Sequence, residues 1–169
     1  MEVNVQLRDE DAEKTVLGTI IAERDAIEQV RELLCEECFY KPFHAEIYKA
    51  ILQIVSSGER ADLISVKGRL QANEVKFDMV EYMKVVSCHT FDLYQHACRL
   101  QDLYIRRRFY AIGQYLVSNS HTESEDIEDV TKKVTDDLSS LFKSSSTTIS
   151  TINEGLESIY QTINENLSG

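Results

Sequence analysis

The chain has 169 residues, 43% of them hydrophobic, and a formal net charge of -11, a composition typical of a globular protein and unlike that of a disordered chain. One proline and six glycines are too few for the turns of an all-β protein or a doubly wound sheet, so the chain is predicted to be all-α. No apolar run is long enough to span a membrane, and the acidic N-terminus lacks the features of a signal peptide. We therefore expect a cytoplasmic protein without membrane association.

Residues 1–90 are predicted to form a compact globular head of short helices. The first helix is predicted to begin after Asp9, whose position suits an N-cap, and to end near Ala22. Gly18 lies inside this helix at a cost of about 1 kcal/mol relative to alanine, which suggests that another backbone approaches closely there. A capping pattern predicts a second helix over residues 25–34.

Three further helices of the head carry clear start or stop signals. Pro42 suits the first turn of a third helix, which the sequence "SSG" ending at Gly58 is predicted to stop. Asp62 is a candidate N-cap for a fourth helix and Asp78 for a fifth, each short and apolar on one side. Helices of this kind pack into a small layered core.

Residues 91–143 are predicted to form an antiparallel helical hairpin. The segment 91–117 has good helical periodicity and would extend roughly 40 Å as one helix. A second long helix follows a polar turn and repeats apolar residues at nearly heptad intervals. Because two helices alone enclose little core, we expect the hairpin to pair with a second copy. The predicted interface positions of this helix are Ile127, Val130, Val134, Leu138 and Leu141.

Residues 144–169 are predicted to form a linker followed by one short amphipathic helix. The polar stretch "KSSSTT" has the composition of a linker. A short amphipathic helix beyond a linker is marginal in isolation, so we expect it to dock on another domain. The apolar positions expected to make that contact are Ile152, Leu156, Ile159 and Ile163.

The basic run Arg106–Arg108 stands out in an acidic chain, because residues 96–117 hold one acidic and four basic residues. Successive helix positions point about 100° apart, so the three arginines cannot share one face. The acidic remainder repels phosphate, and we expect DNA contact to be weak or absent. Tyr104, Arg107 and Arg108 are instead predicted to contact a second subunit or another partner.

The sequence contains almost no motif of the kind that indicates catalysis, nucleotide binding or metal binding. The glycine-rich loops that bind nucleotides do not occur, so no catalytic residue, cofactor or metal is assigned. His44 follows a Pro-Phe pair and is expected to make a structural hydrogen bond. The C-x-x-C pair Cys35 and Cys38 leaves a minor alternative, a zinc or redox module. Further ligands for such a zinc would come from Cys88, His89, His96 and Cys98.

Three ordered motifs resemble the N-terminal domain of bacterial replicative DNA helicases of the DnaB family. They are "DAEKTVLGTII" (residues 11–21), "FYKPFHAEIYKAI" (39–51) and "SGERADLISV" (57–66), with weaker similarity through the arginine run. The glycine pair that usually precedes the fifth helix of this family is missing from "QANEVKFDMVEYM". The family-motif positions of this chain are Ala12, Glu13, Leu17, Gly18, Phe39, Tyr40, Pro42, His44 and Asp62.

This resemblance implies a collar domain of a helicase. Domains of this family pair into dimers, assemble as a trimer of dimers and recruit primase, while the linker helix packs on the ATPase domain of a neighbouring subunit. Primase, a helicase loader and other copies of the chain are thus the implied partners. The resemblance implies no enzyme activity for these 169 residues, since ATP and Mg²⁺ belong to the motor domain. A free-standing helical adaptor or regulator of a replication complex is the main alternative.

Overall fold

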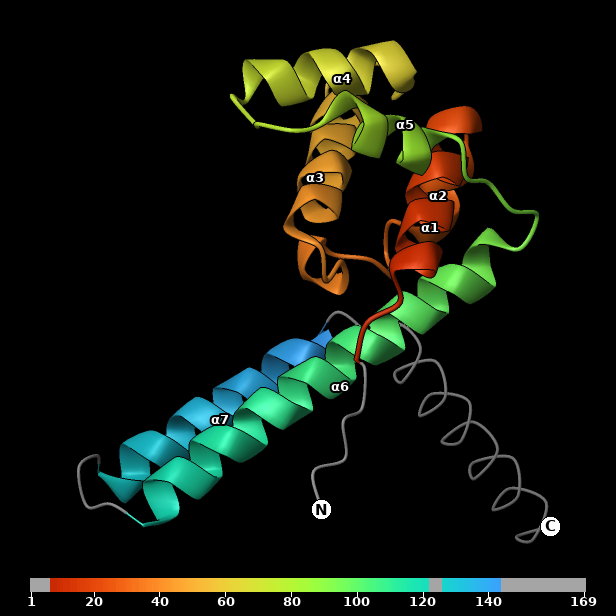
Figure 1. Ribbon diagram of the computed structural model, residues 1–169. Coiled ribbons are helices and arrows are strands. Elements are labelled where there is room, and N and C mark those ends of the chain that lie inside the picture. Colours follow the sequence, from red (N-terminus) through yellow and green to blue (C-terminus); the bar gives the residue numbers. More distant parts are fainter. Residues whose placement is uncertain (1–6, 122–125, 144–169) are drawn as a thin grey trace, which may run out of the picture. The chain divides into compact units, whose positions relative to one another are not determined.

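The computed structural model describes residues 7–121 and 126–143. The predicted linker and linker helix (144–169) lie outside these residues. Every regular element in the described ranges is helical (Figure 1), which confirms the all-α prediction. In chain order the elements are α1 (Glu10–Ala22), α2 (Ala26–Val30), the 3₁₀ helix η1 (Glu36–Cys38), α3 (Pro42–Ser56), α4 (Leu63–Ala72), α5 (Met79–Val86), α6 (Leu93–Ser120) and α7 (Ile127–Lys143).

The described chain divides into two compact units within α6. The N-terminal unit comprises residues 7–111, and the C-terminal unit comprises the described residues from Ile112 to Lys143. The first turns of α6 belong to the N-terminal unit, because their buried side chains join its hydrophobic core. These core residues of α6 are Leu93, Ala97 and Leu100.

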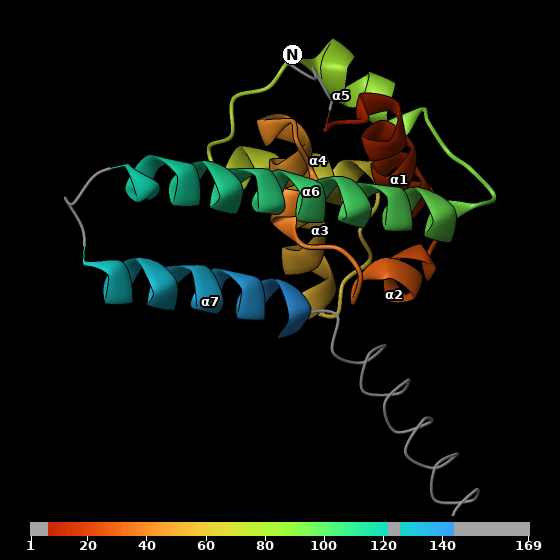
Figure 2. The same cartoon turned by 90° about the horizontal axis from the view of Figure 1, so that it is seen from below.

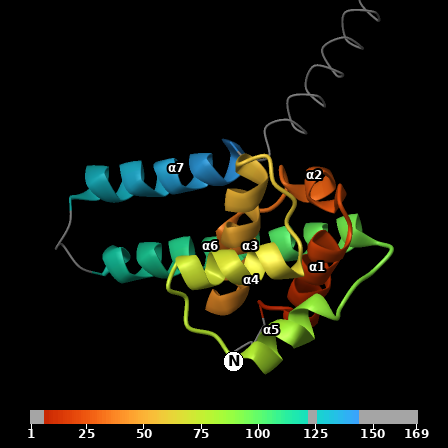
Figure 3. The ribbon, with the colours of Figure 1, turned by 90° about the horizontal axis from the view of Figure 1, so that it is seen from above.

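Helix α1 begins and packs as its sequence indicates. The Asp9 carboxylate accepts a hydrogen bond from the backbone N–H of Ala12 at 3.0 Å, which confirms it as the N-cap. Helices α1 and α5 lie side by side (Figure 3). A Cβ atom added at Gly18 would lie 1.8 Å from the carbonyl oxygen of Cys88 and 2.5 Å from that of Val85. The expected close approach of another backbone at this glycine is therefore confirmed.

The predicted second helix is wrong in its extent. Helix α2 has only five residues and ends at Val30, and the side chain of Asp25 makes no capping hydrogen bond. The backbone N–H groups of Leu33 and Leu34 both donate to the Val30 carbonyl, at 3.0 and 3.1 Å, which closes a turn rather than continuing the helix. The residues that follow form η1 and the entry to α3.

Helix α3 supplies much of the buried centre of the N-terminal unit. Pro42 occupies the first helical position as predicted. Ile47 and Ile51 are fully buried, and burial of an aliphatic side chain of this size contributes about 1.5–3 kcal/mol. The buried tyrosines satisfy their hydroxyl groups, since Tyr48 donates to the Leu34 carbonyl at 3.2 Å.

Helices α4 and α5 begin at the predicted residues because local caps fix them. Asp62 accepts hydrogen bonds from the backbone N–H groups of Ile64 and Ser65, at 2.9 and 2.8 Å, and the Ser65 hydroxyl accepts one from the Asp62 N–H. Asp78 caps α5 through the N–H of Val80 at 3.0 Å. These reciprocal and single caps satisfy N–H groups that a helix start leaves unpaired.

In the C-terminal unit, the last turns of α6 and helix α7 lie side by side and antiparallel (Figures 1 and 2). The ammonium group of Lys133 lies 4.0 Å from the ring centroid of Tyr115, a cation–π contact between the two helices. Asp126 caps α7 through the N–H of Glu128 at 3.0 Å.

Candidate functional site

Two of the family-like motifs meet at a buried carboxylate. Glu13 of α1 is 0% exposed and accepts hydrogen bonds from the backbone N–H groups of Tyr40 at 2.6 Å and Lys41 at 3.3 Å. Nδ1 of His44 lies 2.7 Å from the second carboxylate oxygen of Glu13. Three groups that lie 27, 28 and 31 positions after Glu13 in the sequence thus converge on its side chain, which satisfies the carboxylate in the interior.

This cluster fastens the start of α3 to α1. Lys41 is the N-cap residue of α3 and contributes no side-chain cap, and the Glu13 carboxylate accepts from the backbone N–H of Lys41 itself and of the preceding Tyr40. A negative charge at this end of a helix is also favoured by the helix dipole. Glu13 and His44 are each only 1% exposed as side chains, so the pair is out of reach of a substrate. The expected structural hydrogen bond of His44 is confirmed.

The other motif residues also have structural uses. Phe39 is buried, and its ring centroid lies 5.0 Å from that of Tyr48. Tyr40 is 48% exposed, with the guanidinium of Arg8 5.3 Å and that of Arg107 5.9 Å from its ring centroid.

Arg107 connects three segments of the N-terminal unit through backbone carbonyls. Its guanidinium donates to the carbonyl oxygens of Leu7 at 2.9 Å, Glu37 at 2.7 Å and Cys38 at 3.0 Å. The planar group with several fixed donors suits such a set of acceptors, and charge-assisted bonds are stronger than neutral ones. The N-terminal segment, η1 and α6 are thereby held together.

The other residues of the arginine region differ from Arg107. Nε of Arg106 donates to Asp102 one helical turn earlier at 2.8 Å, and the arginine side chain is 60% exposed. Arg108 is half-buried, and Tyr104 packs against the core of the N-terminal unit, where burial raises the pKa of its hydroxyl. The assignment of Tyr104, Arg107 and Arg108 to an interface with another chain stays a prediction.

The C-terminal unit exposes apolar side chains on both of its helices. Leu116 is 43% exposed, Val117 59% and Ile127 71%. A Cβ added at Gly113, one turn before Leu116 and Val117, would meet no atom within 4 Å, so a second helix has room to approach there. Sequence reasoning missed Leu116 and Val117. Their spacing of three and four residues from Gly113 is the signal that identifies this face.

The predicted interface stripe of α7 is only partly on the surface. Ile127 is exposed, whereas Val130 and Leu141 are 4% and 3% exposed and contribute to the interior of the chain. Val134 and Leu138 are half-buried. Their assignment to an interface between chains stays a prediction, with Ile127 as the position where a partner would bury the most new surface.

The structure brings Cys35 and Cys38 together, with their sulfur atoms 3.4 Å apart. Among residues 7–121 and 126–143, no group of three or more histidine, cysteine, aspartate or glutamate side chains is placed to hold a metal ion. Within those residues the pair with Cys88, His89, His96 and Cys98 therefore does not form a zinc site.

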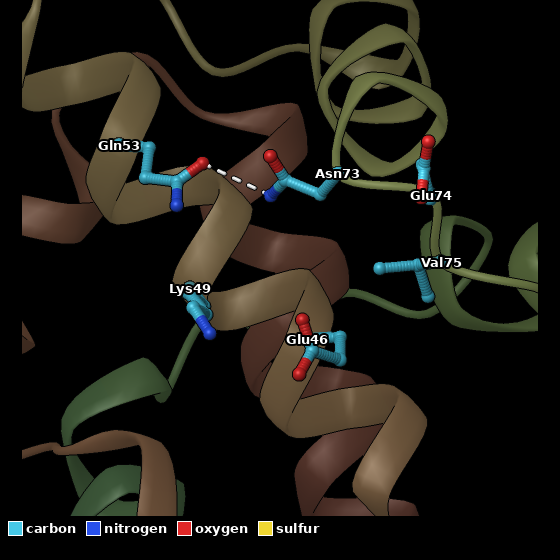
Figure 4. Close-up of a pocket in the computed structure, with 6 residues that line it drawn as sticks. All are labelled: Glu46, Lys49, Gln53, Asn73, Glu74 and Val75. Carbon is cyan, nitrogen blue, oxygen red and sulfur yellow. Dashed lines mark hydrogen bonds between the residues drawn. The ribbon is translucent and has the colours of Figure 1, made fainter.

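A shallow polar groove lies between α3 and the end of α4 (Figure 4). Asn73 donates to the side-chain carbonyl of Gln53 across it at 3.0 Å. Its lining is mainly charged and amide groups on the surface, without a buried convergent set of the kind that fixes a small ligand. The lining residues are Glu46, Lys49, Gln53, Asn73, Glu74 and Val75.

None of the described helices has the length and apolar character that crossing a membrane requires. Among the described residues, the features above are those of a helical domain that holds itself together through buried motif residues and exposes apolar helix faces.

Comparison with known proteins identifies the class of this domain. The family model "DnaB-like helicase N terminal domain" matches residues 5–92, which include all three motifs and the Glu13–His44 cluster. The chain belongs to this family. The matched region is distinct from the ATPase motor domain of these helicases.

Individual relatives agree with this assignment. The replicative DNA helicase DnaB of Rickettsia conorii is 30% identical over 122 residues, covering 69% of this chain and 25% of the relative. That of Mycobacterium leprae is 42% identical over 59 residues, covering 35% of this chain and 10% of the relative. The crystal structure of the N-terminal domain of DnaB helicase from Mycobacterium tuberculosis has 26% identity and a TM-score of 0.70, covering 78% of this chain and 96% of that one. The chain spans about a quarter of the length of the Rickettsia conorii relative.

Proposed function

We propose that this chain is the collar domain of a cytoplasmic replicative DNA helicase, which self-associates and recruits primase. Membership in the DnaB N-terminal family supports the connection with DNA replication. In this proposal, copies pair into dimers and three dimers form the collar of a hexamer. ATP and Mg²⁺ are bound by the motor domain, and a helicase loader is a further partner.

The exposed apolar face of the C-terminal unit carries the self-association part of the proposal. Leu116 and Val117 lie one turn after the open position at Gly113 on α6, and Ile127 is exposed at the start of α7. Fully burying side chains of this kind contributes about 1.5–3 kcal/mol each, and an isologous dimer buries the same set twice. This face therefore offers a large gain to a second copy that covers it.

A matched pair of substitutions tests the dimer. Val117 and Val80 are 59% and 60% exposed, and they lie in the C-terminal and N-terminal units respectively. We expect Val117→Asp to weaken self-association by at least about 100-fold, because burying an unpaired carboxylate at an interface is strongly unfavourable. Val80→Asp is the control and is expected to leave the dissociation constant within about threefold of the unchanged chain.

The measurement is mass by light scattering over a concentration series, with circular dichroism confirming helix content. A strictly monomeric unchanged chain, or equal weakening by the two substitutions, contradicts the proposed dimer face. The primase part is tested separately by adding the carboxyl-terminal domain of the same organism's primase. A stable complex with the primase domain supports the collar function, whereas a dimer that does not bind this domain favours a free-standing adaptor.

A further inference from the structure

The two thiols of the C-E-E-C segment lie in one turn and face each other. Cys35 is the N-cap residue of η1 and Cys38 its third helical residue. Residues three apart in a 3₁₀ helix are eclipsed and separated by about 6 Å along the helix axis, within the Cα separation of roughly 4.4–6.8 Å that a disulfide spans. The sulfur atoms are already 3.4 Å apart and would close to about 2.05 Å in a disulfide.

The turn is held in this shape from two sides. The backbone N–H of Cys35 lies 3.4 Å from Sγ of Cys38. The carbonyl oxygens of Glu37 and Cys38 accept hydrogen bonds from the Arg107 guanidinium at 2.7 and 3.0 Å. Since these contacts order the dithiol before any reaction, closing the disulfide requires little further loss of chain entropy.

The two thiols differ in acidity and in exposure. The hydrogen bond from the Cys38 thiol lowers the pKa of Cys35, against the opposing effects of burial and of Glu37. The pKa of Cys38 is raised by the same hydrogen bond and then by burial, although Arg107 lowers it in part. Cys35 is half-buried and Cys38 is 1% exposed. These differences make Cys35 the thiol that reacts first and Cys38 the one that follows.

We propose that Cys35 and Cys38 form a redox-active dithiol that exchanges reversibly with disulfides of small thiols, of which oxidised glutathione is the representative. In the first step the Cys35 thiolate attacks one sulfur of the small disulfide, forming a mixed disulfide and releasing one thiolate. In the second, Cys38 attacks Sγ of Cys35 and its proton passes to the departing sulfur, which leaves as the second small thiol. Two protein thiols are oxidised and one small disulfide is reduced to two thiols.

Thiol exchange at Cys35 and Cys38 is independent of the proposed collar function, because it depends on sulfur geometry and not on any partner. Cys88 provides an internal comparison, since its thiol donates to the Lys84 carbonyl at 3.2 Å and lies outside the turn. We expect Cys35 and Cys38 to oxidise at a ratio of oxidised to reduced glutathione at least about tenfold lower than that required by Cys88 and Cys98.

The test uses the full chain in a series of glutathione buffers, with acid quenching, alkylation of remaining thiols and peptide mass spectrometry. The expected product links Cys35 to Cys38, disappears on return to reduced glutathione, and leaves Cys88 and Cys98 alkylated. Oxidation of all four cysteines at the same glutathione ratio would overturn the proposal. So would an unlinked mixed disulfide that persists on the unchanged chain.

Two variants separate the roles of the thiols. With Cys38→Ala, the mixed disulfide on Cys35 is expected to accumulate, because no second thiol can displace glutathione. With Cys35→Ser, the buried Cys38 is expected to remain unmodified under the same buffers. Rapid glutathione attachment to Cys38 in the second variant would overturn the proposed order of attack. Circular dichroism checks that each variant is folded. If a variant does not fold, the Cys35–Cys38 disulfide found in the unchanged chain still decides the test.

Discussion

The N-terminal and C-terminal units differ more in what they enclose than in what they expose. Both have apolar side chains on the surface, such as Ile64 at 77% and Ile127 at 71% exposure. The N-terminal unit, however, surrounds large and fully buried side chains including Tyr48 and Tyr82. In the described C-terminal unit, the buried hydrophobic residues are Ile112, Val130 and Leu141. A filled core stabilises the first unit internally, whereas the second has more to gain from a partner.

Their polar contacts show the same contrast. Hydrogen bonds of the N-terminal unit join residues far apart in sequence, as between the N–H of Thr90 and the hydroxyl of Thr19, or Arg107 and Leu7. In α7, the hydroxyl groups of Thr131 and Thr135 each reach back to a carbonyl one turn earlier. Long-range contacts make unfolding of the N-terminal unit cooperative. Substitutions there are expected to change stability, and those on the exposed C-terminal face to change association.

The largest expected effect is at the buried carboxylate. Glu13→Ala leaves the N–H groups of Tyr40 and Lys41 and the ring of His44 without their acceptor, and we expect a loss of about 3–5 kcal/mol in the free energy of unfolding. Urea unfolding followed by circular dichroism measures it. Glu28→Ala is the control, since Glu28 makes only an exposed ion pair and its loss costs about 1 kcal/mol or less. Similar losses from both would refute the fastening role of Glu13.

The next effect concerns the contact between α1 and α5. Gly18→Ala places a methyl group against the backbone carbonyl of Cys88, and backbone cannot move aside as a side-chain end can. We expect the free energy of unfolding to fall by about 1–3 kcal/mol or more, as measured by thermal or urea unfolding. Gly68→Ala is the matched control, because its Cβ enters open space in α4. It is expected to stabilise by up to about 1 kcal/mol through helix propensity, so two losses of equal size would contradict the packing explanation.

A smaller effect is expected at the cap of α4, where Asp62→Ala removes an acceptor and costs about 1 kcal/mol. The N–H of Ser65 lowers the pKa of Asp62 below its usual 3.8. The stabilisation due to its charge is thus present above the unfolded value and is lost as the pH falls through the folded value. Asp62→Asn keeps a neutral cap that does not titrate. The difference in free energy of unfolding between this variant and the unchanged chain, measured in urea, should therefore shrink on acidification. A deficit independent of pH would contradict this.

The smallest effect is a gain in stability. Glu74 follows α4 with φ of 57°, in the left-handed region that costs a residue with a Cβ roughly 1 kcal/mol. Glu74→Gly removes this strain but increases the freedom of the unfolded chain, so we expect a net gain below about 1 kcal/mol in the free energy of unfolding, measured by urea unfolding. Gly58→Ala is the inverse control, since Gly58 has φ of 77° and open space at its Cβ. If it does not lose stability, backbone strain is not the cause.

Local signals in the sequence predicted the helix starts well. Asp9, Asp62 and Asp78 each cap the helix that follows them, and Pro42 occupies a first helical position. These signals depend on neighbours within three residues, which a sequence displays directly. The same reasoning failed at Asp25, where the local pattern is present but the side chain forms no cap and α2 ends after five residues.

Contacts between distant residues were not available to such reasoning. Helical spacing places Glu13 three and four residues before the buried Val16 and Leu17, but its partners are defined only when the segment around His44 is folded against it. The family motifs contained both residues without indicating that they touch. Arg107 likewise belongs to a basic run in the sequence, and its three carbonyl acceptors come from segments up to 100 positions away.

The Glu13 carboxylate, which accepts hydrogen bonds at the entry to α3, also constrains the order of folding. Because Glu13 lies 27 positions before Tyr40, the backbone N–H groups that lead into α3 gain this acceptor only when the intervening loop has closed. Closing such a loop costs entropy that neither helix can recover alone. The N–H groups of Tyr40 and Lys41 and the ring of His44 thus meet Glu13 only as α3 docks on α1, and a nascent chain that has emerged only as far as η1 lacks all three partners.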